Sequence, residues 1–187
     1  MTISPDQNPE PVFPEDLLEM PDPGADKKRS WYVAHVKSRR EKALAVFLCR
    51  WGIAYYLPLI NKRQTSSRRI RYSLVPVFPG YVFVYADLDG RYNALRSNHI
   101  SRMIAVEDPD MLLQELNQIH RVLHAQQPVY PVEFVTVGRR VRVTKGPMKD
   151  VEGIVMRKDK KYRLVLNVTS IAQSVSLEID ADMVESL

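Results

Sequence analysis

The chain has 187 residues, and its 27 lysines and arginines exceed its 22 aspartates and glutamates, giving a formal net charge of +5. A single cysteine excludes an internal disulfide and a cysteine-built zinc site. No apolar run approaches the ~20 residues of a membrane helix, and the N-terminus lacks the basic and apolar regions of a secretory signal. We therefore expect a cytoplasmic protein with no membrane contact and with one medium or two small domains.

The charge is unevenly distributed along the chain. Residues 1–26 hold seven acids and no base, residues 27–126 hold 17 bases and 7 acids, and residues 127–187 hold 10 bases and 8 acids. The three parts therefore carry −7, +10 and +2. The bases are densest in residues 27–72, where 13 of them face only Glu41. Such a basic region is typical of proteins that bind a polyanion, most often nucleic acid.

The first 28 residues differ in composition from the rest. They contain six of the 13 prolines, few aromatic residues and no apolar periodicity. Segments of this kind bury too little apolar surface to offset the entropy of ordering. We predict a disordered, acidic, proline-rich tail over 1–28, which acts either as a solubilising segment or, through a short helix at Asp16–Met20, as a contact to a partner.

Residues 29–125 predict an α+β domain. The expected strands are Ser30–Val36, Ala54–Leu59, Val75–Val77, Tyr81–Ala86 and Arg102–Val106, and helices are expected between Ser38 and Gly52, over Asp89–Ser97 and from Asp108 to Ala125. Residues 61–71 carry five bases and no acid, which predicts a positively charged hairpin tip.

The first predicted helix carries a signal at each end. Ser38 and Glu41 form an S-x-x-E capping box, and Gly52 suits the left-handed position after the last turn. Between them, apolar residues recur at helical spacing: Leu44, Phe47, Leu48 and Trp51. The basic residues lie off this stripe, so the helix is expected to be apolar on one side and basic on the other.

The pattern changes after residue 125. Residues 126–134 contain two prolines and no periodicity, which predicts a linker. From residue 135 to 187, short alternating segments predict a small β-barrel with strands at Arg139–Lys145, Val151–Lys158, Tyr162–Val168 and Val175–Ile179.

Four segments in this order resemble the NusG family of transcription elongation factors. They are Trp31-Tyr32-Val33 before a basic helix, the run from Val77 to Val84 (VFPGYVFV), Leu95-Arg96-Ser97 before a strand, and a KOW-like run from Val137 to Val143 followed by Gly146-Pro147 and Gly153-Ile154-Val155. The resemblance covers residues 30–187. It implies an NGN domain, an antiparallel sheet flanked by helices, followed by a KOW domain, a small SH3-like β-barrel.

The resemblance implies that the NGN domain binds the clamp helices of RNA polymerase through an apolar face. The matching positions are His35, Phe78, Pro79, Tyr81 and Phe83. Since Tyr81 and Phe83 are two residues apart, they share one face of a strand, while Val82 and Val84 share the other. A strand that is apolar on both faces needs a cover on each. The alternative to a partner on one face is that the domain covers both faces itself.

The resemblance also implies that upstream or non-template DNA lies along the basic start of the first helix. The same DNA would approach residues 96–99, at the corner between the short helix Asp89–Ser97 and the strand that follows it. The matching positions are Lys37, Arg39, Arg40, Lys42, Arg96, Asn98 and His99. Basic residues there would contact phosphates in a salt-sensitive, sequence-independent way. The alternative is a solvated basic face.

KOW domains of the family bind either NusE, a ribosomal protein, or the terminator Rho. The matching contact positions here are Met148 and Ile171, apolar but not aromatic. They could equally close the end of the barrel. In RfaH, a relative, this region can refold into a helical hairpin, but the alternation over 139–168 and Gly153 predict a constitutive barrel.

Two short segments resemble the specialised antiterminators UpxY and LoaP: Lys37-Ser38-Arg39 with Glu41-Lys42, and Tyr55-Tyr56-Leu57-Pro58. We therefore expect a monomeric, operon-specific antitermination factor of the kind that also includes RfaH. The alternatives are a housekeeping NusG that terminates with Rho and a ribosome-associated, RNA-binding KOW protein. The near-neutral charge of residues 127–187 disfavours the last.

No enzyme is expected. His120 and His124 have metal-ligand spacing on a helix, but no third ligand accompanies them with a recognisable spacing. None of the seven glycines forms a phosphate-binding loop, and no Ser/His/Asp arrangement is present. We predict no catalytic residue, no cofactor and no metal.

Overall fold

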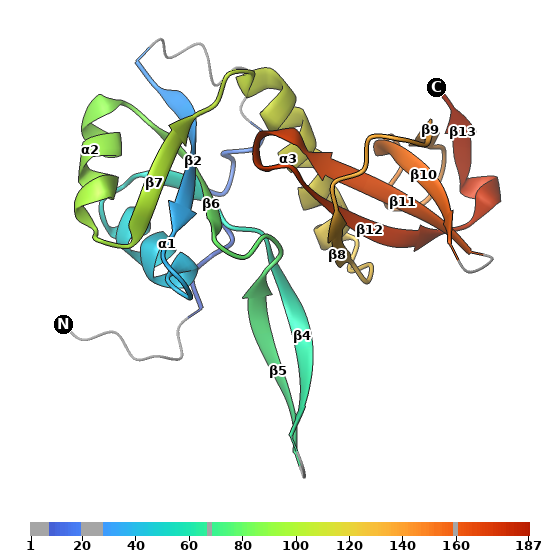
Figure 1. The fold of residues 1–187 in the computed structure, drawn as a ribbon, viewed down its shortest axis with the longest axis horizontal. Helices are drawn as coiled ribbons and strands as arrows, with labels where there is room; N and C mark the ends of the chain where they lie inside the picture. The colour runs from blue at the N-terminus through green and yellow to red at the C-terminus, as the bar shows by residue number, and fades with distance from the viewer. Residues whose placement is uncertain (1–7, 20–27, 67–68, 159–160) are drawn as a thin grey trace. The chain divides into compact units, whose positions relative to one another are not determined.

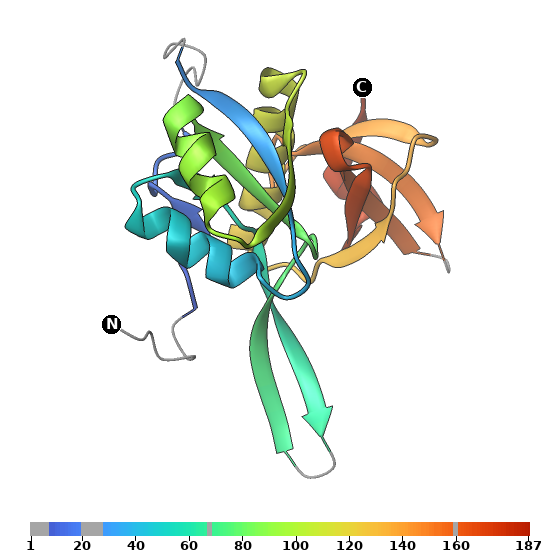
Figure 2. The same cartoon turned by 60° about the vertical axis from the view of Figure 1, so that its left-hand side comes forward.

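The computed structural model describes residues 8–19, 28–66, 69–158 and 161–187. Its contacts divide the chain into two compact units, Met1–Pro109 and Asp110–Leu187. The chain combines helices with antiparallel sheets, which confirms the predicted α+β class (Figures 1 and 2). In the parts of the chain that the structure describes, no helix is both long and apolar enough to cross a membrane.

The first unit is built on a five-stranded antiparallel sheet with the order β1-β3-β6-β2-β7. Its strands are β1 (Val12–Phe13), β2 (Ser30–Val36), β3 (Ala54–Tyr56), β6 (Tyr81–Ala86) and β7 (Ile100–Ala105), and its helices are α1 (Glu41–Arg50) and α2 (Leu88–Arg96). Apart from β1 and the exact bounds, this is the predicted order of elements.

The two faces of β6 enter different parts of the interior. Val82 and Val84 belong to a core cluster with Leu44 and Leu48 of α1. Phe83, on the opposite face, is also buried. This alternation is the one predicted from the spacing of Tyr81 and Phe83.

A long two-stranded hairpin leaves the first unit. β4 (Leu59–Ser66) pairs with β5 (Arg69–Pro76), and the pair extends away from the five-stranded sheet (Figures 1 and 2). The strand predicted over Ala54–Leu59 is divided at Leu57-Pro58, because proline cannot donate a ladder hydrogen bond within a sheet. The predicted basic tip therefore belongs to a regular β-ribbon, except for residues 67–68, which lie outside the described residues.

The predicted capping box of α1 is wrong. The helix begins at Glu41 after the N-cap residue Arg40, and no side chain caps it. Glu41 is buried, and its Oε1 accepts a hydrogen bond from the Gly80 N–H at 2.8 Å. The C-terminal signal is confirmed, since Gly52 has a φ of +64° in the left-handed region.

The second unit contains α3 (Pro109–His124) and a six-stranded antiparallel sheet with the order β13-β9-β10-β11-β12-β8. The strands are β8 (Tyr130–Glu133), β9 (Arg139–Val143), β10 (Glu152–Lys158), β11 (Lys161–Val168), β12 (Gln173–Ile179) and β13 (Val184–Ser186). Gly153 sits where β10 approaches β11 closely: a Cβ there would lie 2.6 Å from the Val165 carbonyl oxygen. The chain needs glycine at this point of the sheet.

Two segments that were predicted to be unstructured contribute strands. Tyr130–Glu133, inside the predicted linker 126–134, pairs with β12 as β8. Val12–Phe13, inside the predicted disordered tail 1–28, pairs with β3 as β1, and Leu17 and Leu18 are buried. In both cases prolines obscured a short apolar strand at a sheet edge, where proline is tolerated. Residues 1–7 and 20–27 of the tail lie outside the described residues.

The predicted boundary between the domains also differs from the observed grouping. The sequence places the last helix in the first domain, whereas the contacts place α3 with the second unit. Two of its side chains explain this grouping: Glu115 accepts hydrogen bonds from Thr169, and Gln118 accepts one from the Glu152 N–H.

Candidate functional site

Three segments of the first unit meet at the C-terminal end of β2. The Val36 N–H donates to the Gly80 carbonyl at 2.8 Å, and the Lys37 N–H donates to the His99 carbonyl at 2.8 Å. The buried Glu41 carboxylate holds the Gly80 N–H from the start of α1. The Phe78–Tyr81 turn, the beginning of α1 and the α2–β7 corner are therefore fixed around one strand end.

Two neighbouring rings, one exposed and one half-buried, lie at this strand end. His35 of β2 and Tyr81 of β6 are register partners, and their ring centroids are 5.3 Å apart. His35 is exposed and Tyr81 is half-buried. Ser101 of β7 orients the histidine, because its hydroxyl donates to the His35 carbonyl at 2.8 Å and lies 2.9 Å from Nδ1. Pro79 is exposed in the neighbouring turn.

The remaining two aromatic residues predicted for this surface lie inside the protein. Phe78 and Phe83 are 1% and 0% exposed. Their rings meet edge to face at 6.3 Å, and Phe83 also stacks on Tyr56 at 6.4 Å. The structure thus brings His35, Pro79 and Tyr81 to the surface and places the two phenylalanines in the core.

Basic and polar residues gather beside the rings. The Lys37 Nζ donates to the Asn98 Oδ1 at 2.6 Å. Partial burial lowers the pKa of His99, and the positive charges of Arg40 and Lys37 lower it further. These four residues, Lys37, Arg40, Asn98 and His99, form what we call the basic corner.

Asn98 of the basic corner and Arg39, the neighbour of Arg40, have left-handed backbone conformations. Arg39 has a φ of +59° and Asn98 a φ of +60°. Asparagine tolerates this region, but for arginine it is uncommon and costs about 1–3 kcal/mol. Backbone strain of this kind concentrates at binding sites, so Arg39 is an observed outlier that points to function here.

Two further residues predicted to contact nucleic acid have other partners. The Lys42 Nζ donates to the Asn8 Oδ1 at 2.6 Å, and the Arg96 guanidinium lies over the Tyr92 ring at 5.8 Å from its centroid. The i,i+4 spacing of Tyr92 and Arg96 on the predicted helix is a signal for the second contact, whereas nothing in the sequence indicates the first. Asn8 lies in a segment predicted to be disordered, and Tyr92 was not singled out.

In the second unit, the predicted contact residues are largely inside the barrel. Met148 is 6% and Ile171 is 9% exposed. Met148 lines a groove of about 610 Å³, and Ile171 is not among the described residues that line it. The groove is lined by Gln127, Lys145, Pro147, Met148, Tyr162, Glu178, Ile179, Asp180, Ala181 and Met183.

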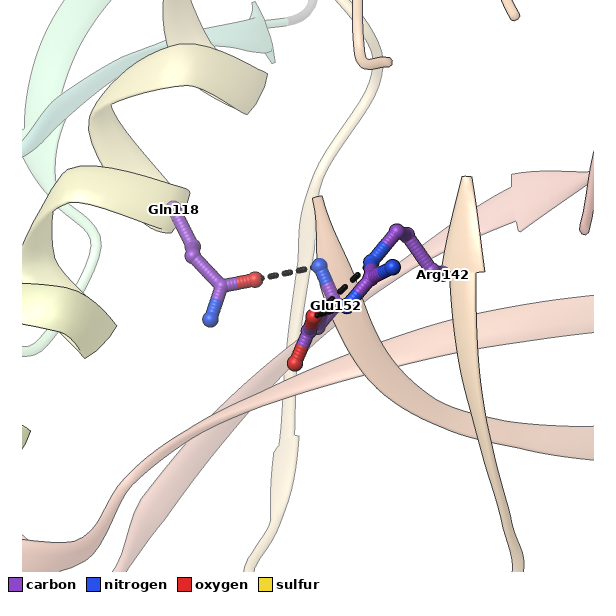
Figure 3. A network of polar contacts seen from close by, with 3 residues as sticks. All are labelled: Gln118, Arg142 and Glu152. Carbon is purple, nitrogen blue, oxygen red and sulfur yellow. Dashed lines mark hydrogen bonds and ion pairs between the residues drawn. The ribbon is translucent and has the colours of Figure 1, made fainter. Parts of the chain in front are cut away.

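A polar network connects α3 with the barrel in the same unit. Figure 3 shows the Gln118 side chain directed at the Glu152 backbone, whose N–H donates to Gln118 Oε1 at 2.6 Å. The Glu152 carboxylate in turn accepts from Arg142 Nε at 2.9 Å and from its Nη2 at 2.6 Å, which raises the pKa of Arg142. Spacing along the chain could not have revealed this network, because it joins three separate elements.

The His120 and His124 rings, which have metal-ligand spacing in the sequence, lie 4.3 Å apart on α3. Within residues 8–19, 28–66, 69–158 and 161–187, no group of three His, Cys, Asp or Glu side chains is placed to hold a metal ion.

The segments that meet at the end of β2 lie within a match to a known family. The sequence model described as "Transcription termination factor nusG" matches residues 29–139, which include β2, α1, the Phe78–Tyr81 turn and the α2–β7 corner. The chain belongs to the NusG family. It is therefore a transcription factor of the NusG type, and the predicted resemblance is confirmed.

Two known proteins are similar to the chain. The transcription termination/antitermination protein NusG of Pasteurella multocida (strain Pm70) is 28% identical over 140 residues, which span 67% of this chain and 68% of that protein. The crystal structure of the MjSpt4:Spt5 complex in conformation B covers 84% of this chain and 96% of its own chain, with 16% identity and a TM-score of 0.23.

Proposed function

We propose that this NusG-family chain is an operon-specific antitermination factor. In this proposal the first unit binds the clamp helices of RNA polymerase and favours the closed clamp, which opposes pausing. The observation that supports it is the pair of His35, which is exposed, and Tyr81, which is half-buried, at the end of β2, inside the segment that matches the family. Aromatic residues at the centre of an interface contribute a large part of its binding energy.

Phe78 and Phe83 take part in this proposed surface from beneath. Their edge-to-face contact packs the turn on which Pro79 and Tyr81 are presented. A buried framework of this kind keeps the exposed residues in one conformation before binding, which lowers the entropic cost of association.

The basic corner supports the second part of the proposal, a contact with upstream or non-template DNA. Lys37, Arg40 and His99 lie within electrostatic range of one another, so a phosphate placed there would interact with all three. Such contacts position DNA without reading its sequence. The His35–Tyr81 pair and the basic corner share the end of β2, so polymerase and DNA would be bound side by side.

The second unit would recruit another machine, either the ribosome through NusE or Rho. The groove beside Met148 supports a binding role, because it combines apolar residues such as Ile179 and Met183 with polar ones. Two binding units on one chain raise the effective concentration of the second partner at the transcription complex.

The polymerase contact is tested by measuring the affinity of the full chain for RNA polymerase from the organism that encodes it. Tyr81→Ala should weaken binding at least about tenfold, as expected for an aromatic residue central to an interface. Tyr130→Ala removes a tyrosine that is exposed on the second unit and serves as the matched control. Equal affinities of both variants and the unmodified chain would refute the assigned surface.

Operon specificity needs a separate experiment in cells. Crosslinking of the chain to DNA, followed by sequencing, should give a signal concentrated on one gene cluster. A signal over all transcribed genes would contradict operon specificity and support the housekeeping alternative.

A further inference from the structure

Residues 8–19, which precede the family match, form a packed segment on the edge of the first sheet. Val12 and Phe13 pair with Tyr56 and Tyr55 of β3. The Leu57 N–H donates to the Pro11 carbonyl at 2.6 Å, which extends the pairing by one residue. We call residues 8–19 the N-terminal strap.

Side chains of the strap anchor it to the unit. Phe13 stacks on Tyr55 at 6.2 Å and packs against the core cluster, and Leu17 and Leu18 are 1% and 3% exposed. Because burial of apolar side chains stabilises a folded chain, the strap is held by apolar contacts and not by charge. It is therefore a built part of the first unit.

The strap carries a charge opposite to that of the helix beside it. It contains four acids, Glu10, Glu15, Asp16 and Glu19, and no base, and all four are exposed. The Tyr55 hydroxyl donates to the Glu10 carbonyl at 2.9 Å. Burial raises the pKa of this tyrosine, and the charges of Cys49 and Glu10 add to the shift, so the Glu10 carboxylate is close to the α1–β3 region.

One direct contact joins the strap to the basic helix. The Asn8 side chain accepts a hydrogen bond from the Lys42 Nζ at 2.6 Å. Lys42 follows Arg39 and Arg40 in the chain and is one of the residues assigned to DNA contact. A lysine that is held by the strap has fewer donors available for a phosphate.

We propose that the N-terminal strap is an intramolecular competitor of nucleic acid, which occupies Lys42 and lowers the affinity of the basic face of α1 for phosphates. This inference rests on the proposed binding of DNA by the first unit. The strand pairing of the strap stays intact when DNA binds, and only the Lys42–Asn8 contact is exchanged for a phosphate. The strap would thus set the affinity of α1 for DNA phosphates, a contact that does not depend on the DNA sequence.

The experiment uses the full chain and short duplex and single-stranded DNA of mixed sequence. The variant E10Q/E15Q/D16N/E19Q neutralises the strap but keeps Val12, Phe13, Leu17 and Leu18. The matched control, E133Q/D150N/D180N/E185Q, neutralises four exposed acids of the second unit. Hydrogen exchange of the Leu57 amide, which donates to Pro11, reports whether the strap remains docked.

The strap variant should bind DNA about tenfold more tightly at low salt, and the control variant no more than about twofold more tightly. Asn8→Ala should raise the affinity about threefold in the unmodified chain and have no effect in a Lys42→Gln chain, because the two residues act on each other. Equal effects of the strap variant and the control would show a dependence on net charge alone and overturn the inference.

A different result is expected if the first unit does not bind DNA at all. If no variant, including the one with a neutral strap, binds DNA at about 50 mM salt, the first unit has no phosphate-binding surface. The proposed DNA contact is then wrong, and the inference falls with it.

Discussion

The two units of the chain present their predicted contact residues in opposite ways. In the first unit, His35 and Lys37 are exposed and Tyr81 is half-buried around the end of β2. In the second unit, Met148 and Ile171 are both buried. The net charge differs less, with +4 over the first unit and +1 over the second, but 13 of the bases in the first unit lie in residues 27–72, where the only acid is Glu41. Clustered charged residues in a sequence therefore predict an exposed surface, whereas apolar residues in a small barrel are more often buried in its core.

The largest loss of stability is expected from a substitution that destabilises only the second unit. Gly153→Val places side-chain atoms against the Val165 carbonyl and should destabilise the barrel by about 3 kcal/mol. Both tryptophans of the chain, Trp31 and Trp51, lie in the first unit, so their fluorescence reports that unit. Thermal unfolding followed by circular dichroism should show an early transition that tryptophan fluorescence does not show. A single transition, unchanged in both signals, would contradict the tight packing at Gly153.

A second substitution separates the exposed residues of the first unit from their support. Glu41→Ala leaves the Gly80 N–H, which lies in a half-buried turn, without its acceptor and should cost about 2 kcal/mol of folding stability. Glu41→Gln keeps an acceptor oxygen and should recover most of the loss. Urea unfolding followed by tryptophan fluorescence measures both variants. If alanine and glutamine give the same stability, the carboxylate does not hold the turn.

The charge difference between the units can be tested with paired variants. Lys37→Gln with Arg40→Gln should weaken DNA binding roughly tenfold and make the slope of log affinity against log salt shallower by about two, as expected for two lost phosphate contacts. Lys149→Gln with Arg157→Gln removes the same charge from exposed positions of the second unit. Equal losses in the two pairs would mean that the basic corner has no special role.

The smallest expected effect concerns pH. Burial and the neighbouring Arg40 and Lys37 hold the pKa of His99 below its ordinary value of 6.5, and a bound phosphate would raise it again. DNA binding then takes up a proton, so affinity should rise about threefold as the pH falls from about 7.5 to about 5.5. His99→Gln should remove this dependence, and a dependence unchanged in that variant would place the titrating group elsewhere.

The lowered pKa of His99 affects folding stability in the opposite direction: lower pH favours DNA binding but reduces stability. Because the folded chain binds the His99 proton less tightly than the unfolded chain, the stability contributed by the neutral ring is present above pH 6.5. It is lost as the pH falls through the folded-state pKa. Titrations of DNA binding therefore need a parallel check that the first unit remains folded.

The sequence predicted those features that depend on neighbours along the chain. The strand Ser30–Val36, the left-handed Gly52 and the helix that begins at Pro109 follow from local periodicity and turn chemistry. The face of β6 that carries Tyr81 and Phe83 follows from the two-residue repeat of a strand. Motif order was sufficient to identify the family.

Features set by distant contacts could not be predicted in this way. Glu41 has the spacing of a capping box but bonds to Gly80, which lies 39 residues away. Phe78 and Phe83 fit a family contact pattern, yet they are packed against each other in the core. The strap was missed because prolines and acids dominate its composition, while Phe13, Leu17 and Leu18 provide its anchoring contacts.

We propose that the end of β2 presents a surface for RNA polymerase. A photo-reactive amino acid placed at position 81 in the full chain should crosslink to polymerase in an assembled elongation complex. The same amino acid at position 130, an exposed tyrosine of the second unit, should crosslink far less. Crosslinking of similar strength from both positions, or none from position 81, would contradict a polymerase-binding surface at the end of β2.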